Sequence, residues 1–170
     1  CTDGYVLTRT WTATDNCGNT TTDEQVITAV DTQAPVFVGL PNNVTIECDA
    51  TIPAPANVTA EGACEGGLNV VFQETNVAGS CVDNYTIVRT WSSVDDCGNA
   101  ATVTRTITVR DTKSPTLNVV PNDITISCGG NVPNPAPVTA TDNCDTNVEI
   151  VFTEVKADGA CEGSYTLTRT

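Results

Sequence analysis

The sequence predicts an all-β protein built from tandem immunoglobulin-like antiparallel β-sandwich domains, each of about 80 residues and each held by two disulfides. Three observations predict this fold. The chain of 170 residues contains 30 Thr and 22 Val, and β-branched residues favour strands. Its cysteines recur at one fixed spacing along the chain. Short runs of alternating apolar and polar residues are separated by Gly, Pro and Asn, which is typical of sandwich folds.

The repeat covers the whole chain. Related positions are Cys1 and Cys81, Cys17 and Cys97, Cys48 and Cys128, Cys64 and Cys144, and Cys81 and Cys161. Asp-Thr followed by Pro35 or Pro115 marks the seams, because proline ends an alternating strand. We therefore predict that residues 1–33 are the C-terminal part of one repeat, residues 34–113 a complete repeat, and residues 114–170 the N-terminal part of the next.

Within the complete copy, alternation of apolar and polar residues predicts the strands in order. Nothing in the sequence indicates a helix. The expected strands are Val44 to Cys48, Val58 to Ala60, Leu68 to Glu74, Tyr85 to Val94 and Val103 to Val109.

The predicted topology also assigns the disulfides. Cys81 and Cys97 flank one strand of about ten residues, which spans roughly 33 Å, and a disulfide tolerates Cα separations only up to about 6.8 Å. Because strands reverse at each turn, Cys48 and Cys81 are expected at one pole of the domain and Cys64 and Cys97 at the other. We predict that Cys48 pairs with Cys81, Cys64 with Cys97 and Cys128 with Cys161, and that Cys1, Cys17 and Cys144 have partners beyond this chain.

Composition argues against several classes of function. The 21 acidic and 7 basic residues give a net charge of −14, which disfavours nucleic acid and anionic membrane as partners. No apolar run approaches the roughly 18 residues of a membrane span, so no membrane insertion is expected. The chain has no His and the repeat assigns its thiols to disulfides, so we expect no enzyme. Nine cysteines without zinc-type spacing indicate an oxidising, extracellular compartment.

Two loop segments and a seam carry a family resemblance. The segments are Thr-Ala-Thr-Asp-Asn-Cys, ending at Cys144, and Thr-Ala-Thr-Asp-Asn-Cys-Gly-Asn, ending at Asn19. With Asp31-Thr32 and Pro35, they resemble the hyalin repeat (HYR) family, in particular its four-cysteine variant. The resemblance implies tandem domains of a very large surface protein of Bacteroidota, of the type exported by type IX secretion for gliding motility. Ordinary hyalin repeats carry a small residue where Cys17 and Cys144 stand, so the family does not supply the disulfide pairing.

The acidic loops are the first candidate binding sites. The loop from Asp95 to Asn99 and its counterpart from Asp15 to Asn19 have two interpretations: oxygen ligands for calcium, the one cofactor considered, or Asx turns that shape a hairpin. Asp31 and Asp111, one at each seam, could hold calcium in the same way. The candidate ligands are therefore Asp15, Asn19, Asp95, Asn99, Asp31 and Asp111.

Arg89 is a charge on an otherwise apolar strand face. Its guanidinium is expected to stack on Trp91 or to pair with Glu74 of the adjacent strand, and a ligand-binding arginine is the alternative. Trp91 is expected in the core rather than as a platform for sugars, because aromatic residues dominate sandwich cores.

These features together predict a structural stalk segment of a large extracellular adhesin or filament at the cell surface, which provides reach and mechanical resilience for adhesion. The segment is expected to come from the interior of a longer secreted chain, with neighbouring repeats as its partners. The alternative is a module that binds a surface polysaccharide or another cell-surface protein through the Asp-Asn-Cys-Gly-Asn loops.

Overall fold

The computed structural model describes residues 4–64 and 66–170. Every regular element in this part of the chain is a β-strand, so the described residues offer no helix that could span a membrane. Every strand pair with a defined register is antiparallel, and the absence of helices among the described residues confirms the all-β prediction. Contacts divide the chain into two compact units: the first combines Cys1–Ile46 with Thr51–Val109, and the second combines Glu47–Ala50 with Arg110–Thr170. The division into three repeats stays a prediction.

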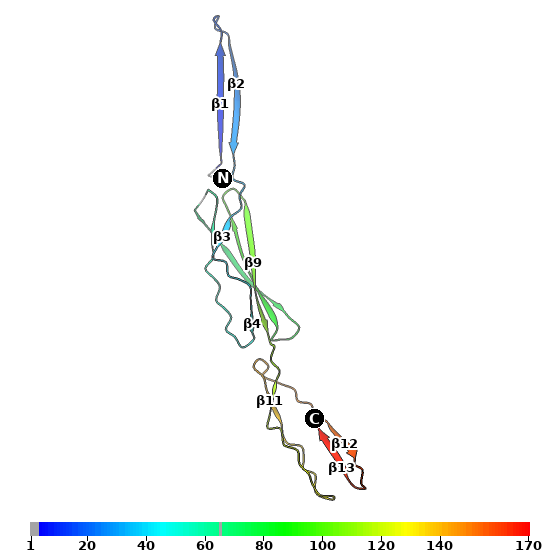
Figure 1. The fold of residues 1–170 in the computed structure, drawn as a ribbon. Helices are drawn as coiled ribbons and strands as arrows, with labels where there is room; N and C mark the ends of the chain where they lie inside the picture. The colour runs from blue at the N-terminus through cyan, green and yellow to red at the C-terminus, as the bar shows by residue number, and fades with distance from the viewer. Residues whose placement is uncertain (1–3, 65) are drawn as a thin grey trace. The chain divides into compact units, whose positions relative to one another are not determined.

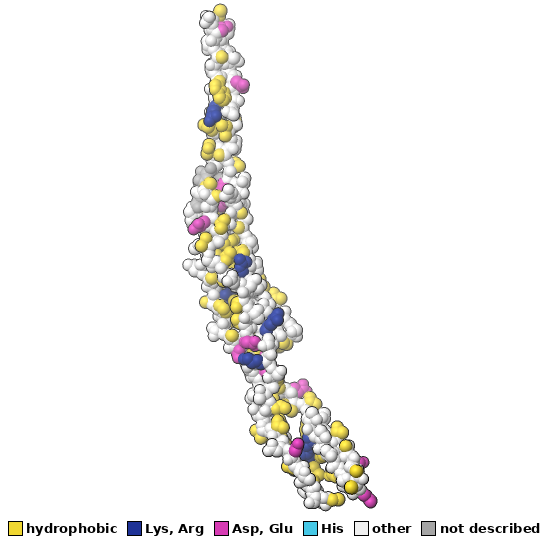
Figure 2. All heavy atoms as spheres, viewed as in Figure 1, with side chains coloured by type: hydrophobic (Ala, Val, Ile, Leu, Met, Phe, Trp, Pro, Cys, Tyr) yellow, Lys and Arg dark blue, Asp and Glu magenta, His cyan; other side chains and the backbone are white. Residues whose placement is uncertain are grey.

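The first unit begins with a long hairpin of β1 (Tyr5–Thr14) and β2 (Thr20–Ala29), seen at the blue end of Figure 1. Its register runs from Tyr5 opposite Ala29 to Thr14 opposite Thr20. Nearly all its side chains are exposed, and Figure 2 shows hydrophobic groups on its surface. The hairpin is therefore held by backbone hydrogen bonds rather than by a core of its own.

Two sheets form the remainder of the first unit. One has the order β3–β5–β6 and the other the order β4–β9–β8–β7. Their strands are β3 (Val36–Val38), β4 (Val44–Glu47), β5 (Thr59–Glu61), β6 (Gly67–Leu68), β7 (Val71–Ala78), β8 (Tyr85–Val94) and β9 (Ala100–Arg110). The expected strand from Leu68 to Glu74 is thus two strands, since the chain leaves one sheet after Leu68 and enters the other at Val71.

The core lies where alternate residues of β8 and β9 are buried. Ile87 and Trp91 of β8 and Ile107 and Val109 of β9 are almost inaccessible, and Ala60 of β5 contributes from the other sheet. Alternation works here because successive strand residues point to opposite faces. Both sheets supply buried residues, as a sandwich requires; the immunoglobulin-like form of that sandwich stays a prediction.

The second unit contains two short hairpins. β10 (Thr116–Asn118) pairs with β11 (Thr139–Thr141), and β12 (Glu154–Asp158) pairs with β13 (Tyr165–Arg169). The first pair stands one repeat after β3 and β5, and the second stands one repeat after parts of β7 and β8. The repeated sequence therefore folds into the same local pairings in both places.

Trp11 and Trp91 are equivalent positions of the repeat in different surroundings. Trp91 is 2% exposed, and its ring centroid lies 5.4 Å from that of Phe72. Trp11 is 55% exposed. The burial of this side chain thus depends on the strands that surround the hairpin and not on the hairpin sequence.

We expect Trp91→Ala to lower the free energy of unfolding by about 3–5 kcal/mol, because a large buried ring leaves a cavity. Trp11→Ala is the matched control and should change it by less than about 0.5 kcal/mol, as exposed substitutions usually do. Urea unfolding followed by far-ultraviolet circular dichroism measures both. Equal effects of the two substitutions would contradict the assignment of Trp91 to the core.

Candidate functional site

An aspartate two residues before a cysteine shapes the β8–β9 turn. Asp95 Oδ1 accepts hydrogen bonds from the backbone N–H groups of Cys97 at 3.0 Å and Asn99 at 2.7 Å, and its Oδ2 accepts one from Asn99 Nδ2 at 2.8 Å. Gly98 has φ +88°, a conformation that glycine adopts without strain. The side chain therefore folds the loop around itself and fixes the backbone of Cys97, which is the Asx-turn interpretation.

The same turn occurs at two other cysteines. In the β1–β2 loop, Asp15 Oδ1 accepts from Cys17 N at 2.9 Å and from Asn19 N at 2.8 Å. In the second unit, Asp142 Oδ1 accepts from Cys144 N at 2.9 Å. We call this arrangement the Asp-x-Cys turn. It presents a cysteine at a fixed position in the loop, and it uses the aspartate oxygens that the calcium hypothesis requires.

Hydrogen bonds favour the charged form of these aspartates. The pKa of Asp15 is lowered, chiefly by the side-chain hydrogen bond from Asn19. At Asp95 burial opposes ionisation most strongly, yet the hydrogen bonds from Asn99, Cys97 and Gly98 together still lower the pKa. The pKa of Asp142 is lowered by the backbone N–H groups of Asp145 and Cys144.

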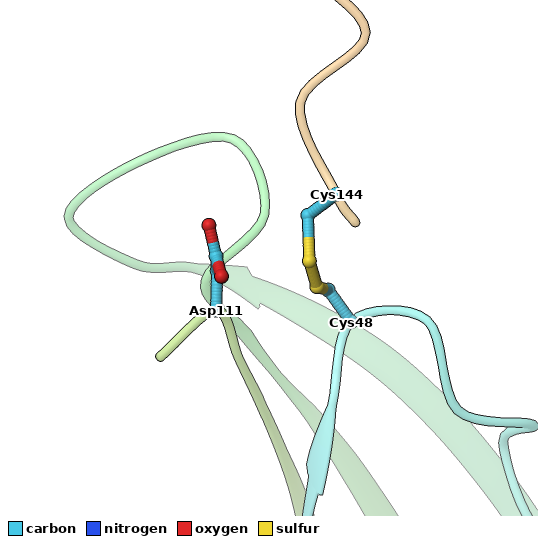
Figure 3. A group of neighbouring side chains, drawn as sticks. All are labelled: Cys48, Asp111 and Cys144. Carbon is cyan, nitrogen blue, oxygen red and sulfur yellow. A yellow bond between two sulfur atoms is a disulfide. The ribbon is translucent and has the colours of Figure 1, made fainter. Parts of the chain in front are cut away.

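A disulfide joins Cys48 to Cys144, with a Cα–Cα distance of 5.9 Å and a sequence separation of 96 residues (Figure 3). Cys48 directly follows β4, and its N–H donates to the carbonyl of Arg110 at 3.0 Å. Asn143 Nδ2 lies 3.3 Å from Cys48 Sγ. By the predicted division of the sequence, Cys48 belongs to the complete copy and Cys144 to the following one. Under that division the bond links two successive repeats.

Polar contacts surround this bond within the second unit. Thr112 Oγ1 donates to Glu47 Oε1 at 2.7 Å, and Lys113 Nζ pairs with Asp49 at 3.2 Å. Both contacts tie the end of β4 and the loop after it to the chain that leaves β9. The loop after β4 is therefore held in the second unit by the disulfide, by a hydrogen bond and by an ion pair.

The carboxylate of Asp111 lies beside the disulfide (Figure 3). Within the described ranges, Cys48, Asp111 and Cys144 are the one group of three residues whose ligand atoms lie within 4.8 Å of one another. A sulfur in a disulfide is not the thiolate that binds metals, so this group does not form a metal site in its oxidised state. Asp111 Oδ1 also accepts the N–H of Lys113 at 3.1 Å, as Asp31 accepts that of Gln33 at 2.8 Å. Calcium binding stays a prediction.

The structure overturns the expected disulfide pairing. Cys48 bonds to Cys144, so the pairing of Cys48 with Cys81 and a partner for Cys144 beyond the chain are both wrong. The physical reason is the strand order, in which β9 separates β4 from β8. Cysteines at the same end of these two strands stand two strand spacings apart, about 9.6 Å, beyond the roughly 7 Å that a disulfide can bridge.

The other expected pairs also differ. Cys97 is in a disulfide, but its partner is not Cys64. Cys128 and Cys161 are both exposed thiols, although Cys128 Sγ lies 3.9 Å from the carbonyl oxygen of Gly163. Cys17 is an exposed thiol. The expectation for Cys1 falls outside the described residues.

Arg89 is 5% exposed and pairs with Glu74 rather than stacking on Trp91. Its Nε donates to Glu74 Oε2 at 2.7 Å, and its Nη2 donates to the carbonyl of Pro53 at 2.7 Å. One repeat later, Arg169 makes the same two contacts, with Glu154 and with the carbonyl of Pro133, both at 2.7 Å. The guanidinium is therefore a repeated link between β8 or its equivalent, the neighbouring strand and a proline-containing loop.

Comparison with known families bears on the same part of the chain. Residues 37–109 match the HYR-like domain with 4 cysteines. The matched HYR-like region spans β3 to β9 and contains Cys48, Cys64, Cys81 and Cys97. An HYR-like domain and a disulfide indicate an extracellular domain. No curated protein and no solved structure matches the chain.

The lowered pKa of Asp95 gives a pH prediction. A carboxyl with a lowered folded pKa stabilises the fold above its ordinary value of 3.8 and loses that contribution as the pH falls through the folded value. We expect carboxyl-carbon NMR titration to place the Asp95 midpoint below 3.8, and the turn to loosen only under more acidic conditions. Asn99→Ala removes the side-chain donor to the Asp95 carboxylate and should raise the midpoint.

Asn19→Ala is the matched control for this titration. It should raise the midpoint of Asp15 and leave that of Asp95 unchanged, because the two turns belong to different hairpins. An Asp95 midpoint at or above the ordinary value would show that the turn hydrogen bonds do not favour the carboxylate.

Proposed function

We propose that this chain is a stalk segment of a large extracellular cell-surface adhesin or filament, in which tandem immunoglobulin-like repeats provide reach and mechanical resilience. The observation that carries the proposal is the Cys48–Cys144 disulfide, because it joins successive sequence repeats. A covalent link between neighbouring repeats suits a protein that bears tension along its length. It has no evident use in a binding module that acts as a single domain.

The long strands of the complete repeat support the same role. β8 pairs with β9 over ten residues and with β7 over eight. Antiparallel strands joined by many backbone hydrogen bonds must break several of them together when pulled along their length. The buried Arg89 and Trp91 then add side-chain packing to the same strands.

The Asp-x-Cys turns favour the stalk over the polysaccharide-binding or protein-binding alternative. The carboxylate oxygens of Asp95 and Asp15 accept hydrogen bonds from their own loops. Polar groups already used within a turn contribute less to a ligand, since each new bond replaces an existing one. The loops thus serve the placement of cysteines better than the recognition of a partner.

Force spectroscopy tests the proposal. With handles at Gln33 and Thr170, we expect a distinct unfolding event, and a maximum extension that increases on reduction of the disulfide. The disulfide hides 96 residues, which correspond to roughly 330 Å of extended chain. The double variant Cys48→Ser/Cys97→Ser is the matched control and should reach the longer extension without reductant, because Cys97 is also in a disulfide.

Two outcomes would contradict the stalk. One is extension of the oxidised chain to the same length as the reduced chain, and the other is the absence of any unfolding event before full extension. Tight binding of a cell-surface polysaccharide that Asp95→Ala abolishes would favour the binding module instead.

A further inference from the structure

The number of residues between the two bonded cysteines indicates which cysteines pair in successive repeats. Cys48 and Cys144 are 96 residues apart. This separation is one full repeat, from Cys64 to Cys144, plus the shorter step from Cys48 to Cys64. The bond therefore joins the first cysteine of one copy to the second cysteine of the next.

Cys97, the fourth cysteine of the complete copy, obeys the same spacing. It is in a disulfide, and the cysteine that precedes it by 96 residues, the separation of the observed bond, is Cys1, the third cysteine of the preceding copy. Cys1 lies outside the described residues, so this assignment rests on the sequence register. The chain contains no other pair of cysteines at this separation besides these two.

We infer that every two successive repeats are joined by two disulfides, each between cysteines 96 residues apart: the first with the second cysteine of the next copy, and the third with the fourth. The rule also accounts for the exposed thiols. Cys17 would pair with a position before residue 1, and Cys81, Cys128 and Cys161 would pair with positions after residue 170.

Cys144 and Cys97, which each pair with a cysteine of the preceding repeat under this rule, lie in the same type of turn. The N–H of Cys144 is held by Asp142 at 2.9 Å, and that of Cys97 by Asp95 at 3.0 Å. In both cases the Asp-x-Cys turn fixes the cysteine relative to its own repeat. The third cysteines are alike as well, since Cys81 and Cys161 each accept a turn hydrogen bond from the residue three positions later.

Each bond forms when two thiols lose two protons and two electrons. The oxidant is a protein or small-molecule disulfide of the extracellular compartment, which is reduced to two thiols by exchange. Because each loop of 96 residues is longer than one repeat, successive loops overlap. Every seam is then spanned by disulfides, and no backbone segment carries tension alone. The pairing rule itself rests on the observed bond and the repeat and does not require the stalk function.

Tryptic mapping of the oxidised monomer tests the rule. Monomer is isolated by gel filtration, thiols are blocked with N-ethylmaleimide, and the denatured chain is digested without reductant. Cleavage after the arginines and lysines separates Cys1 (residues 1–9), Cys97 (residues 90–105) and Cys144 (residues 114–156) from residues 10–89. We expect residues 1–9 linked to 90–105, and residues 10–89 linked to 114–156.

Linkage of residues 10–89 to 90–105, or of 114–156 to 157–169, would overturn the rule, because neither link can join cysteines 96 residues apart. A Cys97→Ser variant provides the matched control and should leave residues 1–9 with a blocked thiol while the other link remains. Recovery of residues 1–9 with a blocked thiol from the unaltered monomer would also overturn the rule. None of these outcomes depends on how the chain behaves under force, so failure here is separate from failure of the stalk proposal.

Discussion

The position of β9 between β4 and β8 is the constraint on which the covalent structure depends. It places the end of β4 next to the end of β9, where the backbone of Cys48 bonds to that of Arg110. From this point the chain runs directly into the next copy. A cysteine after β4 is thus held near the seam and too far from the start of β8, and its bond partner comes from the following repeat.

The remaining interactions serve this arrangement at two levels. Within the complete copy, the buried Trp91 and the link from Arg89 to Glu74 hold β7, β8 and β9 together as one sheet. At the β8–β9 loop, the Asp95 carboxylate accepts three hydrogen bonds that place the backbone of Cys97. A carboxylate that accepts hydrogen bonds from several N–H groups holds a loop firmly in one conformation, since hydrogen bonds to a charged group are stronger than neutral ones.

The sequence predicted the local structure well because alternation and turn residues are local signals. It placed the strand from Tyr85 to Val94, anticipated the core position of Trp91 and included Glu74 among the partners of Arg89. The division of Leu68 to Glu74 between two sheets has no such signal, since a strand that changes sheets keeps its alternation. The disulfide partners were predicted wrongly for a related reason: alternation and spacing do not show which strands are neighbours, so the sequence did not reveal that β9 separates β4 from β8.

Digestion with a lysine-specific protease tests the link between repeats most directly, because Lys113 and Lys156 are the two lysines of the chain. After thiol blocking and denaturation, cleavage without reductant gives residues 1–113, 114–156 and 157–170. The account predicts that 1–113 and 114–156 remain joined through Cys48 and Cys144 until reduction, while 157–170 is released. Residues 114–156 joined to 157–170, with 1–113 released alone, would contradict it.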